Sequence, residues 1–285
     1  MYNKNFKIQF RTFIKTKIHL IIFDIYKFLF LKKIFFKFNK LIFDLSVRGL
    51  GILNHENSRL SGEDFFIKTV TKNTQQFLAL DIGANVGTYS NKIKKLVPQA
   101  KIYAFEPHPN CFKELSIQAI KYDYTAINLA CSDTEGQGQL YDYPNNQSSI
   151  HASLYKDVIE EIHQNKSLVW NIQITTIDEF VELNALTRIN LLKIDTEGNE
   201  YKVLQGAKKT IESGKINCIH FEFNWMNVVT KVFLRDFKKI LPNYRFYRML
   251  PDGLISLDPY DPIYCEIFRY QNIVAIHEKS QCNFP

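Results

Sequence analysis

The sequence predicts an α/β fold with a mostly parallel central sheet, preceded by a basic amphipathic helix. Short apolar runs alternate with segments of helical periodicity along most of the chain, which is typical of parallel strands joined by helices. Residues 77–97 have the pattern of a strand, a glycine turn and a helix. Acidic side chains follow several of the expected strands, at the edge where open α/β sheets bind ligands.

Length and composition indicate a globular domain with an appendage. The chain has 285 residues, of which 46% are hydrophobic, and a formal net charge of +7. Residues 1–49 hold eleven Lys and Arg against two Asp, which leaves the rest of the chain with a net charge of −2. A polyanion-binding body is expected to have its own basic stripe, so a nucleic-acid partner is disfavoured. Five dispersed cysteines without C-x-x-C favour reduced thiols in a cytoplasmic protein over a disulfide scaffold or a zinc site.

Residues 1–49 are expected to form a basic, aromatic, amphipathic helical extension of a domain at 50–285. Charges interrupt its apolar blocks, so none approaches the roughly 18 to 20 residues that span a bilayer, and a secretory signal is disfavoured for the same reason. Lys33, Lys37, Lys40 and Asp44 share one helical face, and apolar side chains cover the rest. This pattern fits a peripheral membrane contact, and it equally fits packing against the body or a second subunit.

The first helix of the domain is expected from Glu63 to Val70, with Ser61 as its possible N-cap. The strand that follows leads into D-I-G-A-N-V-G, which begins at Asp81. A dinucleotide fingerprint needs a glycine where Asn85 stands, and a P-loop needs a lysine after Gly87. The remaining pattern, D-x-G-x-N-x-G, resembles the first cofactor motif of class I S-adenosylmethionine methyltransferases, with a ligand-free tight turn as the alternative.

The second strand is expected within K-I-Y-A-F-E-P-H-P and stops at Pro107. Glu106 lies 19 residues after Gly87. Nucleotide-binding α/β folds place an acid at about this offset to accept hydrogen bonds from ribose hydroxyls. His108 next to it is interpreted as structural in preference to a general base.

A helix at 110–120 and a third strand, T-A-I-N-L-A-C, are expected to lead to Asp133. This carboxylate is placed either to receive an adenine amino group or to serve an ordinary turn. The next expected elements are a short strand at 139–143, a polar loop at 143–153, a charged helix at 155–168, a strand at 170–176 and a short helix at 177–183.

The second information-rich stretch is N-L-L-K-I-D-T-E-G-N-E-Y-K-V-L-Q-G-A, which begins at Asn190. It predicts a buried strand at 191–194, a turn, and a helix at 200–211. Lys193 lies inside that strand, where a lysine is costly unless it is paired. Its expected partners are acids at neighbouring strand ends: Asp81, Asp195 and Glu222. The remaining expected elements are a strand at 218–223, a helix at 228–241, strands at 244–250 and 272–277, and an irregular loop at 251–264.

Taken together, D-I-G-A-N-V-G, F-E-P-H-P, N-L-A-C-S-D and L-L-K-I-D-T-E-G-N-E-Y-K-V-L-Q-G-A resemble the FkbM-type methyltransferase family over about residues 60–278. The resemblance implies a class I methyltransferase (Rossmann-like) sheet of seven strands with helices on both faces and an antiparallel last strand. It also implies S-adenosylmethionine as methyl donor and O-methylation of a sugar, glycolipid or related metabolite. The cofactor residues carried over by motif are Asp81, Gly83, Asn85, Gly87, Glu106, Ser132 and Asp133.

A hydroxyl is a poor nucleophile, so a general base is expected to add about 100- to 10,000-fold. The candidates are Asp195, Glu197, Glu222 and His220, with the first two preferred because they flank the turn nearest the expected methyl group. These acids could instead form a structural ion-pair network with Lys193, and a metal at this turn has no further ligand spacing in its favour. Two other functions stay open: a membrane- or partner-docking protein without turnover, and an RNA methyltransferase.

Overall fold

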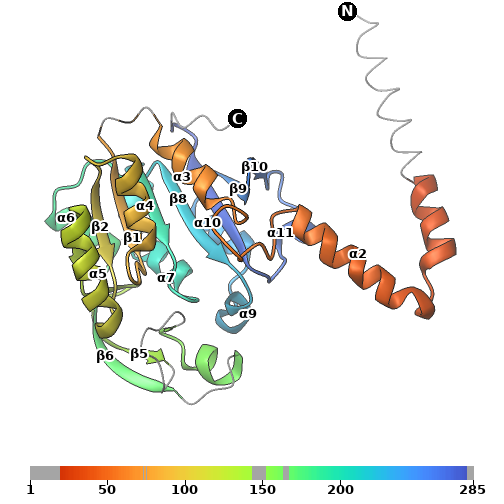
Figure 1. Ribbon diagram of the computed structural model, residues 1–285, viewed down its shortest axis with the longest axis horizontal. Helices are drawn as coiled ribbons and strands as arrows, with labels where there is room; N and C mark the ends of the chain where they lie inside the picture. The colour runs from red at the N-terminus through yellow and green to blue at the C-terminus, as the bar shows by residue number, and fades with distance from the viewer. Residues whose placement is uncertain (1–19, 73, 75, 143–151, 163–166, 281–285) are drawn as a thin grey trace, which may run out of the picture. The chain divides into compact units, whose positions relative to one another are not determined.

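The protein is represented by a computed structural model. It describes residues 20–72, 74, 76–142, 152–162 and 167–280 (Figure 1). The chain divides into two compact units, Met1–Leu50 and Gly51–Pro285, and each is described by itself.

The first unit is helical throughout most of its described part. Residues 20–30 form a helix, a 3-10 turn η1 (Lys33–Phe35) follows, and helix α2 runs over Phe36–Gly49. The expected helical extension is therefore present in residues 20–49 as two helices with a break at residues 31–35, and residues 1–19 lie outside the described part. Among the described residues, no helix is long and apolar enough to cross a membrane.

The second unit is built on an eight-stranded sheet with the order β10-β9-β11-β8-β7-β1-β2-β3. Strand β11 is antiparallel to both of its neighbours, and the strands from β8 to β3 are parallel. This confirms the expected class I arrangement, with one strand more than expected. The bounds are β1 (Leu78–Ile82), β2 (Lys101–Phe105), β3 (Thr125–Ile127), β7 (Leu191–Ile194), β8 (Cys218–Phe223), β9 (Tyr244–Leu250), β10 (Gly253–Ser256) and β11 (Gln271–His277).

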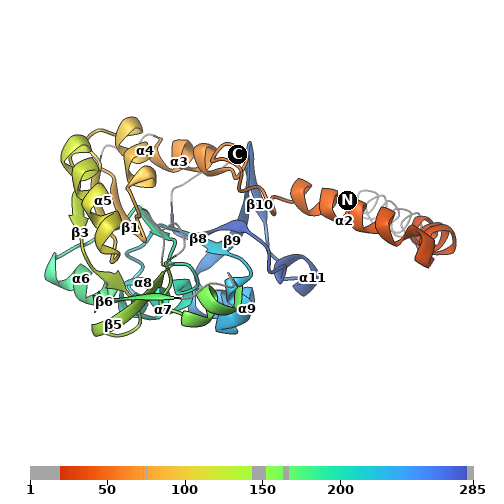
Figure 2. The same ribbon diagram turned by 60° about the horizontal axis from the view of Figure 1, so that its bottom comes forward.

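Helices cover both faces of this sheet because its central strands are apolar on both sides. In β1, Leu80 and Ile82 pack with residues of α6, α7, α8 and α10, whereas Ala79 packs with residues of α3 and α4. Figure 2 shows α3 and α4 on one side of the sheet and α7 and α8 on the other. The bounds are α3 (Glu63–Thr71), α4 (Thr88–Leu96), α5 (Pro109–Tyr122), α6 (Ile177–Leu183), α7 (Glu200–Gln205), α8 (Lys208–Glu212), α9 (Met226–Thr230), α10 (Leu234–Ile240) and α11 (Pro262–Cys265).

A second, three-stranded sheet has the order β4-β6-β5, with β4 (Ala130–Cys131), β5 (Gly136–Asp142) and β6 (Leu168–Thr175). The expected third strand is therefore wrong as one element, because its first half joins the main sheet and its second half pairs with β6. The strand is interrupted at Asn128, whose side-chain amide donates to the backbone oxygens of Glu106 and Pro107.

Several expected elements are corrected by local geometry. The expected helix at 200–211 is two helices that meet at Gly206, and that at 228–241 is two helices separated by Lys231, which has a φ of 56°. Ser61 does not cap α3, because Gly62 occupies that position with a φ of 86°. In the expected charged helix, the described residues form a π-helical turn (Val158–Ile162), and residues 163–166 lie outside the described part. The expected irregular loop contains β10 and α11.

Candidate functional site

A cavity of about 770 Å³ lies at the carboxyl ends of β1, β2, β7 and β8. Parallel sheets of this type bind ligands at this edge. Six of the ten predicted site residues line the cavity: Gly83, Asn85, Glu106, Asp195, Glu197 and Glu222. The first three come from the chain around β1 and β2, and the last three from the chain around β7 and β8. The structure therefore brings the two motifs to one space.

The glycine turn after β1 is held between two neighbouring strands. The backbone N–H groups of Gly83 and Ala84 donate to the carbonyl oxygen of Phe105 at 3.0 and 2.9 Å. Gly83 has a φ of 77°, and a Cβ at this position would lie 1.8 Å from the carbonyl oxygen of Asp195. Only glycine fits here, because a side chain would collide with backbone that cannot yield. The turn leaves its backbone at the cavity surface.

Glu106 joins the ends of β1 and β2. Its Oε2 accepts from the backbone N–H of Asn85 at 2.8 Å, and its Oε1 accepts from that of His108 at 2.8 Å. The residue is buried, and burial raises its pKa to about 7, although both N–H groups favour the ionised form. One carboxylate therefore sets the positions of two turns and still faces the cavity.

Asp81 and Gly87 lie behind the glycine turn and do not line the cavity. Asp81 is buried and accepts a hydrogen bond from the Ser90 hydroxyl at 2.6 Å; burial raises its pKa to about 6. Gly87 begins α4 with a φ of 83°, and a Cβ there would lie 2.2 Å from the Tyr124 hydroxyl oxygen. Both residues support the turn from the protein side.

Ser132 and Asp133 lie beside the cavity without lining it. The Ser132 hydroxyl donates to Asp133 Oδ1 at 2.9 Å, and the Asn199 amide lies 3.3 Å from the same hydroxyl oxygen. Asp133 lines a separate hollow of about 360 Å³. The preceding residues, Ala130 and Cys131, do line the main cavity. The assignment of Ser132 and Asp133 to adenine stays a prediction.

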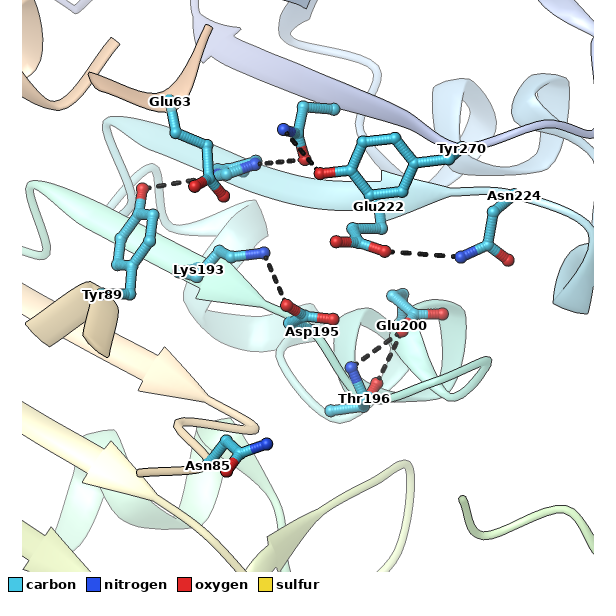
Figure 3. A network of polar contacts seen from close by, with 12 residues as sticks. Glu63, Asn85, Tyr89, Lys193, Asp195, Thr196, Glu200, Glu222, Asn224 and Tyr270 are labelled. Atoms are coloured by element: carbon cyan, nitrogen blue, oxygen red, sulfur yellow. Dashed lines mark hydrogen bonds and ion pairs between the residues drawn. The ribbon is translucent and has the colours of Figure 1, made fainter. Parts of the chain in front are cut away.

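Lys193 lies at the centre of a cluster of acids (Figure 3). Its ammonium nitrogen lies 3.3 Å from Asp195 Oδ2 and 5.7 Å from the ring centre of Tyr89. The expected pairing with Asp195 is confirmed. Burial alone would lower the pKa of Lys193, but the combined negative charges of the surrounding acids, Asp195, Glu222, Glu63 and Asp81, raise it. Lys193 therefore stays an ammonium group.

Glu222 faces the same cavity from β8. Its side chain is partly buried, and the Asn224 amide donates to Oε2 at 3.4 Å. Burial, and then the negative charge of Asp195, raise the pKa of Glu222 well above its ordinary value of 4.5. A carboxylate with a raised pKa holds an accepted proton more tightly than an ordinary carboxylate, which suits a general base.

The turn after β7 is held by Glu200, a role that the sequence analysis missed. Its Oε1 accepts from the N–H of Thr196 at 2.9 Å, from the Thr196 hydroxyl at 3.0 Å and from the N–H of Gly198 at 3.2 Å. Glu197, between them, has a φ of 53°. Its carbonyl oxygen accepts from the Ser153 hydroxyl at 2.7 Å. A glutamate in the first turn of a helix was the available signal.

The histidines have structural contacts. His220 is fully buried and outside the cavity lining, with the Tyr89 hydroxyl 3.0 Å from Nδ1 and Asn272 Oδ1 3.0 Å from Nε2. Burial, and then the charge of Lys193, lower its pKa well below its ordinary value. The His108 side chain accepts a hydrogen bond from the N–H of Cys111 at the start of α5, and its Nε2 lies 3.1 Å from Asp142 Oδ2. His108 also lines the cavity.

The far wall of the cavity comes from segments that carry no motif. Leu53 and His55 lie beside Tyr270, since the N–H of Leu53 donates to the Tyr270 carbonyl at 2.8 Å and the rings of His55 and Tyr270 are 5.7 Å apart. Arg269 and Trp225 also line the cavity. Within the described residues, no group of three or more His, Cys, Asp or Glu is placed to hold a metal ion.

The Methyltransferase FkbM domain model matches residues 81–246 of the chain. The chain belongs to the FkbM methyltransferase family. The matched residues contain every predicted site residue, from Asp81 to Glu222.

Two relatives carry descriptive names. The chain is 29% identical over 157 residues to Hexuronic acid methyltransferase AglP of Haloferax volcanii. This alignment covers 54% of this chain and 60% of the relative. It is 22% identical over 184 residues to 2-O-methyltransferase NoeI of Sinorhizobium fredii, covering 61% and 75%. The alignments span about three fifths of the first curated relatives. A crystal structure of Methyltransferase FkbM from Methylobacillus flagellatus KT aligns with a TM-score of 0.45 and 13% identity, over 70% of this chain and 44% of that one.

Proposed function

We propose that the protein is an S-adenosylmethionine-dependent methyltransferase that O-methylates a hydroxyl of a sugar, a glycolipid or a related metabolite. The observation that carries this proposal is the single cavity in which the glycine turn and Glu106 face the acids of the second motif, Asp195, Glu197 and Glu222. One part of the cavity has the groups for a nucleoside-like cofactor, and the other has groups that could accept a proton.

The cavity suits this cofactor. Its volume of about 770 Å³ falls within the roughly 300 to 1,000 Å³ of small-molecule sites. Gly83 and Asn85 would surround the methionine end, and Glu106 would accept from the ribose hydroxyls. Asp81 and Gly87 would support the turn, and Ser132 with Asp133 would border the adenine. The cofactor, when bound, supplies an electrophilic methyl group on a sulfonium.

Glu222 is the base that the geometry favours. Asp195 and Glu197 are the bases expected from the sequence, but Asp195 is held in an ion pair with the buried ammonium of Lys193 at 3.3 Å. Glu222 has a raised pKa and lines the cavity. It would take the proton of the acceptor hydroxyl as the oxygen bonds to the methyl carbon, and Asp195 would orient the acceptor.

A sugar acceptor is supported by two observations. Trp225 presents a side chain that is 44% exposed at the cavity wall, where an apolar sugar face could pack. The names of two relatives refer to a hexuronic acid and to 2-O-methylation. An RNA acceptor is disfavoured because residues 50–285 have a net charge of −2.

The test has two steps. Calorimetry should detect S-adenosylmethionine binding by the folded protein, and Glu106→Ala should weaken it. Labelled cofactor should then transfer its methyl group to a fraction of hydroxylated glycans or uronic acids. Folded protein that does not bind the cofactor would contradict the proposal. Binding without transfer to any fraction would favour a docking protein without turnover.

A further inference from the structure

The described part of the first unit exposes an unusual amount of apolar surface. Sixteen large apolar side chains between residues 20 and 45 are each at least 36% exposed, with Phe28 at 78%, Leu31 at 75% and Ile34 at 82%. A soluble surface rarely keeps such a contiguous apolar area without a binding role. The other thirteen are Leu20, Ile21, Ile22, Phe23, Ile25, Tyr26, Leu29, Phe36, Phe38, Leu41, Ile42, Phe43 and Leu45.

Helix α2 carries part of this apolar surface and a polar stripe beside it. Phe38, Leu41 and Leu45 follow one another at helical spacing and are 44%, 56% and 61% exposed. Lys37 and Lys40 lie on a different face of the helix, because their positions in the 3.6-residue repeat do not coincide with those of Phe38, Leu41 and Leu45. The helix therefore has an apolar face next to a charged one, on which Asp44 accompanies the two lysines.

The charges of this surface are predominantly positive. Residues 20–49 contain two acids and six basic residues: Lys27, Lys32, Lys33, Lys37, Lys40 and Arg48. Lys33, Lys37 and Lys40 are exposed. Cations beside an apolar face are the signature of a helix that lies in the interface of a bilayer with anionic lipids.

A second copy of the chain fits this surface less well. A coiled coil needs a narrow apolar seam with charges that pair across it, whereas the helix at residues 20–30 is apolar and exposed on almost every side. Two copies would also bring like charges together. A spanning helix is not an option for the described residues, since none is long and apolar enough.

We propose that residues 20–49 bind the surface of a membrane that contains anionic lipids, with the apolar side chains in the interface and the lysines at the headgroups. Such binding would concentrate the protein at a lipid surface. The proposal does not depend on the reaction that the cavity performs.

The test uses the full chain and co-sedimentation with vesicles of phosphatidylcholine, with and without phosphatidylglycerol. Strong binding is expected only with the anionic lipid, and higher salt should weaken it. The triple variant Lys33→Glu, Lys37→Glu and Lys40→Glu should bind at least about 100-fold more weakly, at roughly fivefold or more for each charge. The triple variant Phe38→Ser, Leu41→Ser and Leu45→Ser should also lose binding.

A matched control reverses three exposed charges of the second unit: Lys68, Lys113 and Lys209 to Glu. This variant should bind vesicles like the wild type. Equal loss in the control, or no vesicle binding by the wild type, would overturn the proposal. If the wild type sediments as a dimer that the serine variant dissociates, and vesicles do not compete for it, the surface is an interface between copies and the proposal is wrong. Calorimetry with S-adenosylmethionine shows that each variant is folded, because the substitutions lie outside the cavity.

Discussion

Gly83 is the glycine at which an added side chain would collide most closely with the surrounding backbone. Its φ is 77°, and a Cβ would lie 1.8 Å from the Asp195 carbonyl oxygen. We expect Gly83→Ala to weaken S-adenosylmethionine binding at least about tenfold and to lower the free energy of unfolding by about 1 to 3 kcal/mol. Gly253→Ala is the matched control, because nothing lies within 4 Å of its added Cβ. Calorimetry and urea unfolding measure both effects, and unchanged affinity in Gly83→Ala would refute the assignment.

Glu222 should determine the pH dependence of turnover. Burial and Asp195 raise its pKa well above 4.5, and a base acts only when deprotonated, so kcat/KM should rise with pH through that raised pKa. In Glu222→Gln this rising limb should disappear and kcat should fall by about 100- to 10,000-fold. Glu212→Gln, at an exposed position of α8, should keep the wild-type profile. If Glu222→Gln retained the rise of kcat/KM with pH, another residue would be the base.

Glu106 should make cofactor binding sensitive to pH. Its pKa of about 7 in the free protein lies above the ordinary 4.5 because of burial. The carboxylate is the form that accepts from two ribose hydroxyls, so affinity should fall as the pH drops below about 7. Glu106→Gln should bind more weakly and lose this dependence. Calorimetry from pH 5.5 to about 8.5 covers this titration, and a wild-type affinity that is flat over that range would contradict the ribose role.

The turn between β7 and α7 depends on one buried carboxylate. Glu200 accepts three hydrogen bonds from residues 196–198, and losing a buried acceptor leaves its donors unsatisfied, at about 1 to 3 kcal/mol for each buried group. We expect Glu200→Ala to destabilise the protein by more than about 2 kcal/mol and to lower kcat/KM by displacing Asp195 and Glu197. Glu200→Gln keeps an acceptor oxygen and should lose less. Denaturant unfolding of both variants provides the comparison, and equal losses would contradict this account.

Elements with strong local signals were predictable from the sequence. The strands β1, β2, β7 and β8 are short apolar runs, and the antiparallel last strand was implied by the resemblance of the motifs to the FkbM-type family. The element boundaries that were predicted wrongly are set by contacts with residues far away in the sequence. Helices α7 and α8 meet at Gly206, where a Cβ would lie 2.0 Å from the Ser132 carbonyl oxygen. The third strand divides where Asn128 binds the backbone after β2.

The site was predictable to the same extent. Gly83, Asn85 and Glu106 follow from local spacing, because the turn and the acid belong to one strand–helix–strand unit. The wall formed by His55 and Tyr270 could not be predicted, since it joins segments more than 200 residues apart through a backbone hydrogen bond from Leu53. Hydrophobic periodicity does not record such a contact.

The two units carry the two proposals separately, with the cavity in one unit and the exposed apolar helices in the other. In the part of the chain that the structure describes, the four hydrophobic clusters lie between Phe66 and Ile276, and the residues that line the cavity follow Gly51. Removing residues 1–50 therefore deletes no cluster and no wall of the site. The two proposals can be tested independently of each other.

We expect the chain that begins at Gly51 to unfold cooperatively, with a Tm within about 5 °C of the full chain, because the hydrophobic clusters of the described residues lie outside the deleted segment. It should bind S-adenosylmethionine with the same Kd and should not sediment with anionic vesicles. Calorimetry, thermal unfolding and co-sedimentation on one preparation measure the three properties. Loss of cofactor binding by a folded truncated chain would show that the first unit contributes to the site. Retained vesicle binding would instead place the lipid contact on the methyltransferase unit, where the net charge of −2 gives no attraction to an anionic surface.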